Sequence, residues 1–172
     1  MNLNQYLKLA GVSRPLAFGD FIDIRLPKNL DGSESLPRDY QVTGLNLSLR
    51  NHWWGLWDDP GLGKTLMSQA WSIYWVSEGY KTIVITLSTL IGQYMDDFME
   101  TFPGIERYMD IQRYDYGPEK RAKLEKQWEE RGSWPDVLVM TYEGWSNLFK
   151  EKCPLATPTW FYERGYRAMV AD

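Results

Sequence analysis

The sequence predicts an α/β fold in which helices flank a parallel sheet. Apolar segments rich in β-branched residues, such as KTIVITL (81–87) and DVLVMTY (136–142), alternate with segments of helical period. Strands and helices that alternate in this way are joined by right-handed crossovers and form a parallel sheet. The strands are apolar on both sides, which indicates a sheet that is covered on both faces.

A polar stretch rich in Pro, Gly and Ser divides the chain at residue 35. Residues 1–35 read as a separate N-terminal lead-in of unknown role, and residues 36–172 read as one domain. The lead-in holds a short helix at 3–9, a possible strand in FGDFIDIRL (18–26) and a polar linker in PKNLDGSES (27–35). The domain then reads, in order, as a helix at 38–50, a short buried strand WWGLW (53–57), a helix at 65–78, the strand 81–87, a helix after Ser88, a weak strand MDIQRY (109–114), a charged helix at 118–131, the strand 136–142 and a last strand YRAMVAD (166–172).

The helices of the domain are predicted from side-chain spacing. The third helix places apolar residues on one face, and Ser88 has the chemistry of an N-cap for the fourth. The charged helix PEKRAKLEKQWEER offers only Ala122, Leu124 and Trp128 for burial. The other members of these apolar faces are Leu66, Ala70, Ile73 and Tyr74 in the third helix, and Leu90, Ile91, Tyr94 and Phe98 in the fourth.

Composition limits the classes of function. With 172 residues, 44% of them hydrophobic and 24% charged, the chain fits one soluble domain, and it contains no apolar run that could span a bilayer. Its single cysteine excludes an internal disulfide and a multi-cysteine zinc site, which favours the cytoplasm, the host cytoplasm for a viral protein or the nucleus for a eukaryotic one. A net charge of −4 argues against a broad basic surface for nucleic acid. Nine tryptophans indicate buried aromatic packing, with base stacking as the alternative.

The segment DDPGLGKT (58–65) has the features of a phosphate-binding loop. It lies between a predicted strand and a predicted helix, and its glycines allow successive N–H groups to point at phosphate oxygens. Lys64 supplies a charge for the β- and γ-phosphates, and the Thr65 hydroxyl can bind magnesium. The predicted ATP-binding residues are Asp59, Gly61, Leu62, Gly63, Lys64 and Thr65 of this segment, together with Leu66, which follows it.

The acidic Asp58, where the usual pattern begins with glycine, makes this loop similar to the first motif of superfamily 2 helicases, and within them to the Swi/Snf-type DNA translocases. Further segments resemble this family in the same order along the chain. They are PRDYQVTGLN (37–46), TLSTLIGQYMDDF (86–98), VMTYEGW (139–145) and MVAD (169–172), with Pro37 and Leu87 departing from the family pattern. The resemblance covers residues 36–172 and implies the N-terminal part of a RecA-like ATP-binding lobe.

The resemblance assigns roles to individual residues. Gln41 would select adenine, although a glutamine on a helix surface is the simpler interpretation. Arg38 or Tyr40 would either stack on the adenine or only pack. Ser88, Thr89 and Thr141 would contact the DNA backbone, with helix capping as the alternative for each of them, and both roles could hold together. Asp172 would be the aspartate of the D-E-x-H box and would hold Mg²⁺ together with Thr65.

Asp172 is the last residue, so the glutamate of that box and a second RecA-like lobe do not follow it in the sequence. We therefore expect the chain to bind ATP weakly and to hydrolyse almost none without that lobe, supplied in cis or in trans. The resemblance implies an ATP-dependent motor on DNA, with duplex favoured over single strands or RNA. The alternative is a non-hydrolysing nucleotide-binding or partner-docking protein. A third interpretation, a small-molecule P-loop kinase, does not account for the Gln41 motif or for residues 86–98.

Overall fold

The computed structural model describes residues 1–29, 31, 33, 35–51, 63–153 and 158–171. They divide into two compact units. Unit 1 contains residues 1–74 and 96–108, and unit 2 contains residues 75–95 and 109–172. The helices α3 (Lys64–Ser77) and α4 (Ile91–Thr101) each contribute residues to both units.

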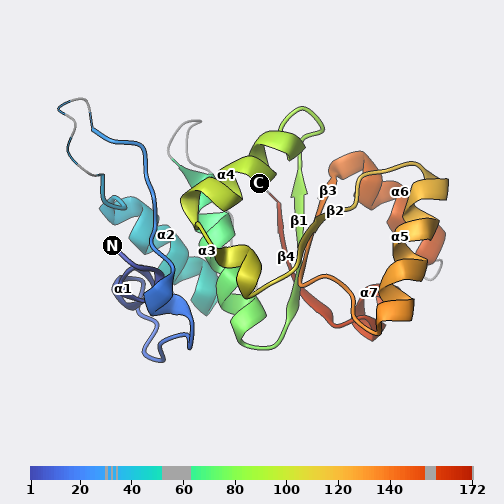
Figure 1. The fold of residues 1–172 in the computed structure, drawn as a ribbon, viewed down its shortest axis with the longest axis horizontal. Helices are drawn as coiled ribbons and strands as arrows, with labels where there is room; N and C mark the ends of the chain where they lie inside the picture. Colours follow the sequence, from blue (N-terminus) through green and yellow to red (C-terminus); the bar gives the residue numbers. More distant parts are fainter. Residues whose placement is uncertain (30, 32, 34, 52–62, 154–157, 172) are drawn as a thin grey trace. The chain divides into compact units, whose positions relative to one another are not determined.

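Unit 2 is built around a four-stranded parallel sheet (Figure 1). Its strands are β1 (Lys81–Thr86), β2 (Ile111–Arg113), β3 (Val137–Thr141) and β4 (Tyr166–Ala171), arranged in the order β2-β3-β1-β4. Within β1 and β3 every residue except Lys81 is buried, because these two strands lie in the middle of the sheet. The predicted α/β class with a parallel sheet and flanking helices is confirmed.

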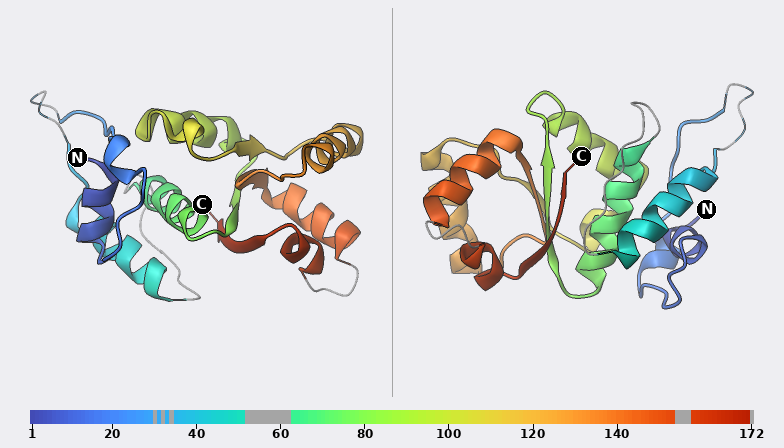
Figure 2. Two further views of the ribbon diagram at one scale, coloured as in Figure 1. Left: turned by 60° about the horizontal axis from the view of Figure 1, so that its bottom comes forward. Right: turned by 180° about the vertical axis from the view of Figure 1, so that it is seen from behind.

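Three helices of unit 2 pack beside this sheet (Figures 1 and 2). They are α5 (Pro118–Arg131), α6 (Tyr142–Lys152) and α7 (Thr159–Glu163). The helix α6 contacts β1 and β3, and α7 contacts β4. The helix α5 begins with a proline in its first turn and ends at Gly132, whose φ of 73° suits the left-handed C-cap of a helix.

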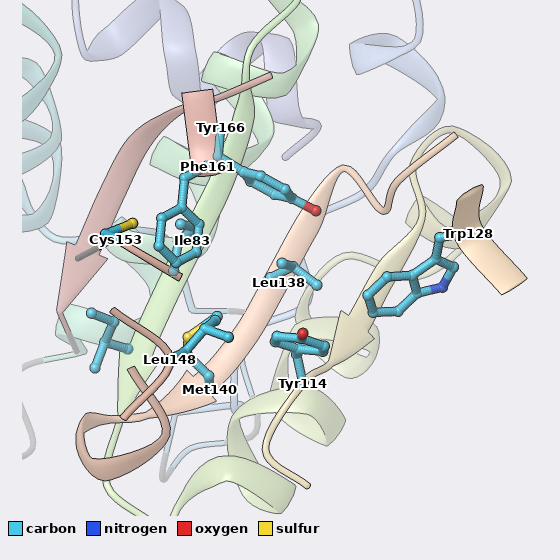
Figure 3. Packing of buried hydrophobic residues seen from close by; sticks show 10 residues of the cluster. Ile83, Tyr114, Trp128, Leu138, Met140, Leu148, Cys153, Phe161 and Tyr166 are labelled. Carbon is cyan, nitrogen blue, oxygen red and sulfur yellow. The ribbon is translucent and has the colours of Figure 1, made fainter. Parts of the chain in front are cut away.

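The core of unit 2 joins these helices to the strands through aromatic side chains (Figure 3). The Trp134 ring stacks edge-on against Trp160 at 5.2 Å and tilts against Trp128 at 5.1 Å. The cluster of buried residues comprises Ile83, Ile85, Tyr114, Trp128, Leu138, Met140, Leu148, Cys153, Phe161 and Tyr166. Trp128 belongs to this core, and the partly buried Trp134, Trp145 and Trp160 pack against it, so these tryptophans take part in aromatic packing as the composition predicts.

Unit 1 packs the N-terminal lead-in against the helix α2 (Asp39–Arg50). The lead-in contributes α1 (Leu3–Leu9) and the 3₁₀ turn η1 (Gly19–Phe21). The phenol of Tyr6 in α1 donates a hydrogen bond to the backbone carbonyl of Gln41 in α2 at 3.3 Å. A second 3₁₀ turn, η2 (Ile105–Arg107), follows the end of α4. The boundary predicted at residue 35 remains a prediction.

Two local predictions are wrong. Residues 18–26 form η1 and a single antiparallel bridge between Asn2 and Asp23 instead of a strand. The reason is that the backbone groups of Ile22 and Ile24 form hydrogen bonds with the residues at the start of α1. The helix predicted after Ser88 begins at Ile91, because residues 87–90 form a turn closed by the Leu90 N–H and the Leu87 carbonyl at 2.9 Å. Ser88 is therefore not its N-cap.

The predicted apolar face of α5 is correct in part. Trp128 is buried and Leu124 is half-buried, whereas Ala122 is exposed. Leu124 and Trp128 are one helical turn apart and share a face, and Ala122 lies off that face. The predicted strand at 53–57 lies outside the described residues. In the described part of the chain, no helix is both long and apolar enough to cross a membrane.

Candidate nucleotide site and candidate DNA contacts

The predicted site residues are distributed over both units. Arg38, Gln41, Gly63, Lys64, Thr65 and Leu66 belong to unit 1, and Ser88, Thr89 and Thr141 belong to unit 2. The loop residues Asp59, Gly61 and Leu62 and the metal ligand Asp172 lie outside the described residues. Each unit therefore contributes its own candidate group, the nucleotide residues in unit 1 and the DNA contacts in unit 2.

Gly63 has the backbone conformation that a phosphate loop needs at its end. Its φ is +72°, in the left-handed region that favours glycine, and α3 begins at the next residue, Lys64. The first N–H groups of a helix have no partner within the helix, and together with the helix dipole they attract anions. Lys64 and Thr65 occupy this first turn, both half-buried, while Leu66 anchors the helix in the core.

The side chain of Gln41 lies directly beside Gly63. Its amide nitrogen, Nε2, is 2.2 Å from the position that a Cβ atom on residue 63 would take. The two residues come from sequence segments that were predicted separately to bind one nucleotide, and both belong to unit 1. The structure therefore brings the adenine-reading candidate to Gly63, the last glycine of the predicted phosphate loop.

The beginning of α2 fixes the orientation of Gln41. Its Oε1 accepts a hydrogen bond from the backbone N–H of Arg38 at 2.8 Å, which satisfies one of the free donors at the helix start. Arginine has no acceptor, so the reciprocal half of a capping box is absent here. Gln41 is 8% exposed, so the interpretation as a surface glutamine is wrong.

Tyr6 supports Gln41 from the lead-in. The Tyr6 side chain is fully buried, and burial raises the pKa of its phenol far above the ordinary value. The phenol therefore remains a neutral donor to the Gln41 carbonyl over the whole physiological pH range. Arg38, the N-cap residue of α2, is exposed, and whether it or the half-buried Tyr40 stacks on a base stays a prediction.

The three DNA-contact candidates lie at one edge of the sheet in unit 2. Thr86 and Thr141 are register partners at the carboxyl ends of β1 and β3, and Ser88 and Thr89 follow β1. Ligands of open parallel sheets bind outside this edge. Ser88 and Thr89 are exposed in the turn before α4, while Thr141 is 4% exposed.

The hydroxyl of Thr141 already has two internal partners. It donates to Asp115 Oδ1 at 2.8 Å and accepts from the Gly144 backbone N–H at 2.9 Å, as the N-cap of α6. A hydroxyl has one proton, so a direct bond from Thr141 to a phosphate requires that the bond to Asp115 break. The geometry gives Thr141 a structural role, and its contact with DNA stays a prediction.

The sequence did not indicate Asp115 and Gly144, the two residues that form hydrogen bonds with the Thr141 hydroxyl. A Cβ atom on Gly144 would lie 2.9 Å from Asp115 Oδ1 and 3.0 Å from Thr141 Oγ1, so only glycine lets the two side chains meet. A glycine in the first turn of a helix is the one local signal that could have indicated such a close approach.

The described residues contain no group of three His, Cys, Asp or Glu side chains that could hold a metal ion. Of the two predicted magnesium ligands, Asp172 lies outside these residues and Thr65 is not one of these four residue types, so the magnesium site stays a prediction. No protein-family model and no curated protein matches the chain.

Proposed function

We propose that the chain is the ATP-binding part of an ATP-dependent DNA translocase that moves on duplex DNA. The observation that carries the proposal is the side-chain amide of Gln41 packed against Gly63 at the start of α3. A phosphate loop alone fits many nucleotide-binding proteins. A buried glutamine that comes from a preceding helix and reaches the last glycine of the loop supports the narrower class.

The residues of unit 1 fit a triphosphate nucleotide. The left-handed Gly63 and the start of α3 suit an anion, Lys64 supplies a positive charge, and Thr65 supplies a hydroxyl for magnesium. In this proposal Gln41 reads the adenine edge, and Asp172 completes the magnesium site. When bound, ATP with magnesium supplies the phosphoanhydride bond whose hydrolysis drives movement.

The carboxyl edge of the sheet in unit 2 is the proposed DNA surface. Ser88 and Thr89 are exposed there and can donate hydrogen bonds to phosphates without reading the base sequence. With a net charge of −4 the chain has no general attraction for DNA, so the contact has to be local.

Nucleotide binding tests the first half of the proposal, because little hydrolysis is expected from residues 1–172 alone. Fluorescent ATP with magnesium is titrated into the chain and into Lys64→Ala, and we expect at least about tenfold weaker binding by the variant, since a lost charge-assisted contact costs about 1.5–3 kcal/mol. Lys126→Ala is the matched control, because the side chain of Lys126 is 78% exposed on α5. Absence of ATP binding, or equal binding by Lys64→Ala, contradicts the proposal.

The response to DNA separates the motor from a nucleotide-binding protein without a motor. In a translocase the two ligands are coupled, so saturating duplex DNA should change the affinity for ATP, and ATP should change the affinity for DNA by the same factor. ATP binding that is unaffected by DNA, in a chain that does not bind DNA, supports the alternative function.

A further inference from the structure

The loop between β2 and α5 gathers two cations around one aromatic ring. The Nζ atom of Lys120 lies 3.5 Å from the centroid of the Tyr116 ring, and the guanidinium carbon of Arg113 lies 5.5 Å from it. A cation within about 6 Å of a ring centroid is attracted to the negative face of the ring. The ring therefore restricts two long side chains that would otherwise move over a wide area of solvent.

This group lies at the same edge of the sheet as the DNA-contact candidates. Arg113 ends β2 and is the register partner of Val139 in β3, and the Tyr114 N–H donates to the Val139 carbonyl at 2.8 Å. The next residue, Asp115, accepts the hydroxyl proton of Thr141. The loop is thus tied to the carboxyl end of β3 and lies beside Thr141, the N-cap of α6.

The two cations remain accessible. Lys120 is exposed, and among the described residues it has no carboxylate within ion-pair distance. The side chain of Arg113 is 40% exposed and forms an ion pair of 3.6 Å with Asp115 Oδ2, while the other carboxylate oxygen of Asp115 accepts the hydroxyl proton of Thr141. The nearby Arg121 differs, because it pairs with Glu151 at 3.3 Å and its side chain is only 13% exposed.

We propose that Arg113, Tyr116 and Lys120 form a contact for the sugar–phosphate backbone of duplex DNA. The inference rests on the proposed function and adds a site that none of the sequence motifs includes. Two cations held together at one tyrosine ring, one exposed and the other partly exposed, match the cationic groups that bind phosphate oxygens independently of sequence. They extend the candidate DNA surface from the ends of β1 and β3 to the end of β2.

The test is the salt dependence of DNA binding by the whole chain. Binding is measured from the fluorescence anisotropy of a labelled short duplex. Each phosphate contact contributes about 0.9 to the slope of log K against log salt, so Lys120→Ala and Arg113→Gln should each make the slope shallower by about that amount. Both variants should weaken binding equally on duplexes of unrelated sequence. Lys126→Ala, at an exposed position on the same helix, should leave the slope unchanged.

Variants of Tyr116 test whether the ring holds the cations. Tyr116→Leu removes the ring, and we expect about two- to fivefold weaker DNA binding, whereas Tyr116→Phe keeps the ring and should lose less. Circular dichroism checks that each variant is folded. A wild-type chain that binds DNA, with slopes unchanged in Lys120→Ala and Arg113→Gln, overturns this inference and leaves the proposed function standing. A wild-type chain that binds ATP but no DNA overturns both this inference and the proposed function as a DNA translocase.

Discussion

The side-chain amide of Gln41 occupies the space in which a side chain on residue 63 would begin, with Nε2 2.2 Å from the Cβ position. Glycine is favoured at position 63 by its φ of +72°, and any larger residue there would also displace the end of the Gln41 side chain. The glycine of the loop and the glutamine of α2 form one structural element, although they are far apart in the sequence. Changes in either residue should affect the other.

Gly63→Ala should weaken nucleotide binding and destabilise the protein. The left-handed backbone conformation alone costs an alanine about 1–2 kcal/mol, and the displaced Gln41 side chain adds to that cost. Chemical denaturation and ATP titration measure the two effects.

Gly79→Ala is the matched control for this change. Gly79 has a φ of +87° but no atom within 4 Å of its Cβ position, so its alanine variant meets only the backbone cost. We expect Gly79→Ala to lose stability and to keep its ATP affinity. Equal loss of ATP affinity in both variants would show that the contact with Gln41 has no bearing on the nucleotide.

Gln41→Ala should reduce the preference for ATP over GTP while it retains binding of the triphosphate. Removal of the side chain deletes a group proposed to read the base, whereas Lys64 and Thr65 remain. It also removes the hydrogen bond to the Arg38 N–H, at a cost of about 1 kcal/mol in unfolding free energy. Competitive titration with both nucleotides measures the preference, and Gln127→Ala, at an exposed position on α5, is the control. An unchanged ATP-to-GTP ratio contradicts the assigned role.

Thr141→Val should destabilise unit 2 by about 1–2 kcal/mol, because it removes an N-cap and leaves Asp115 without its donor. Thr141→Ser keeps the hydroxyl and should restore most of that stability, as measured by urea denaturation. If DNA binding falls in Thr141→Val but not in Thr141→Ser, the hydroxyl contributes to the DNA surface through the position of Asp115 and Arg113. Equal stability of the two variants would refute the capping role.

Alkaline pH should unfold the protein as buried tyrosines ionise. Burial raises the pKa of the phenols of Tyr6, Tyr114 and Tyr166, and the hydrogen bond from Tyr114 to Glu125 raises the Tyr114 pKa further. A raised folded-state pKa gives stability that is complete below the unfolded value of 10.0 and is lost as the pH rises above it. Tyrosinate absorbance should therefore appear in a cooperative step together with loss of helix, and a gradual titration of all tyrosines without unfolding would contradict this.

The sequence predicts the central elements well, because their signals are local. The strands of unit 2 and the charged helix α5 follow from β-branched runs and helical period, and the structure has them within two residues. The predictions at 18–26 and at Ser88 failed because tertiary contacts and a turn decided the outcome. For the site, the sequence indicates Gln41 and Gly63 separately. Their contact, the junction of Thr141 with Asp115, and the cations at Tyr116 depend on side-chain positions that no local pattern encodes.

The strand order also constrains how the chain folds. The strand β1 pairs with β3 on one side and with β4 on the other, and both partners follow it only after long connections. Pairing between residues so distant in sequence requires large loops to close first, which slows folding. During synthesis the apolar β1 therefore emerges well before either neighbour, and its two backbone edges stay unpaired until β3 and then β4 have been made. This interval is when the chain is most exposed to aggregation, and expression at lower temperature or with chaperones should raise the soluble yield.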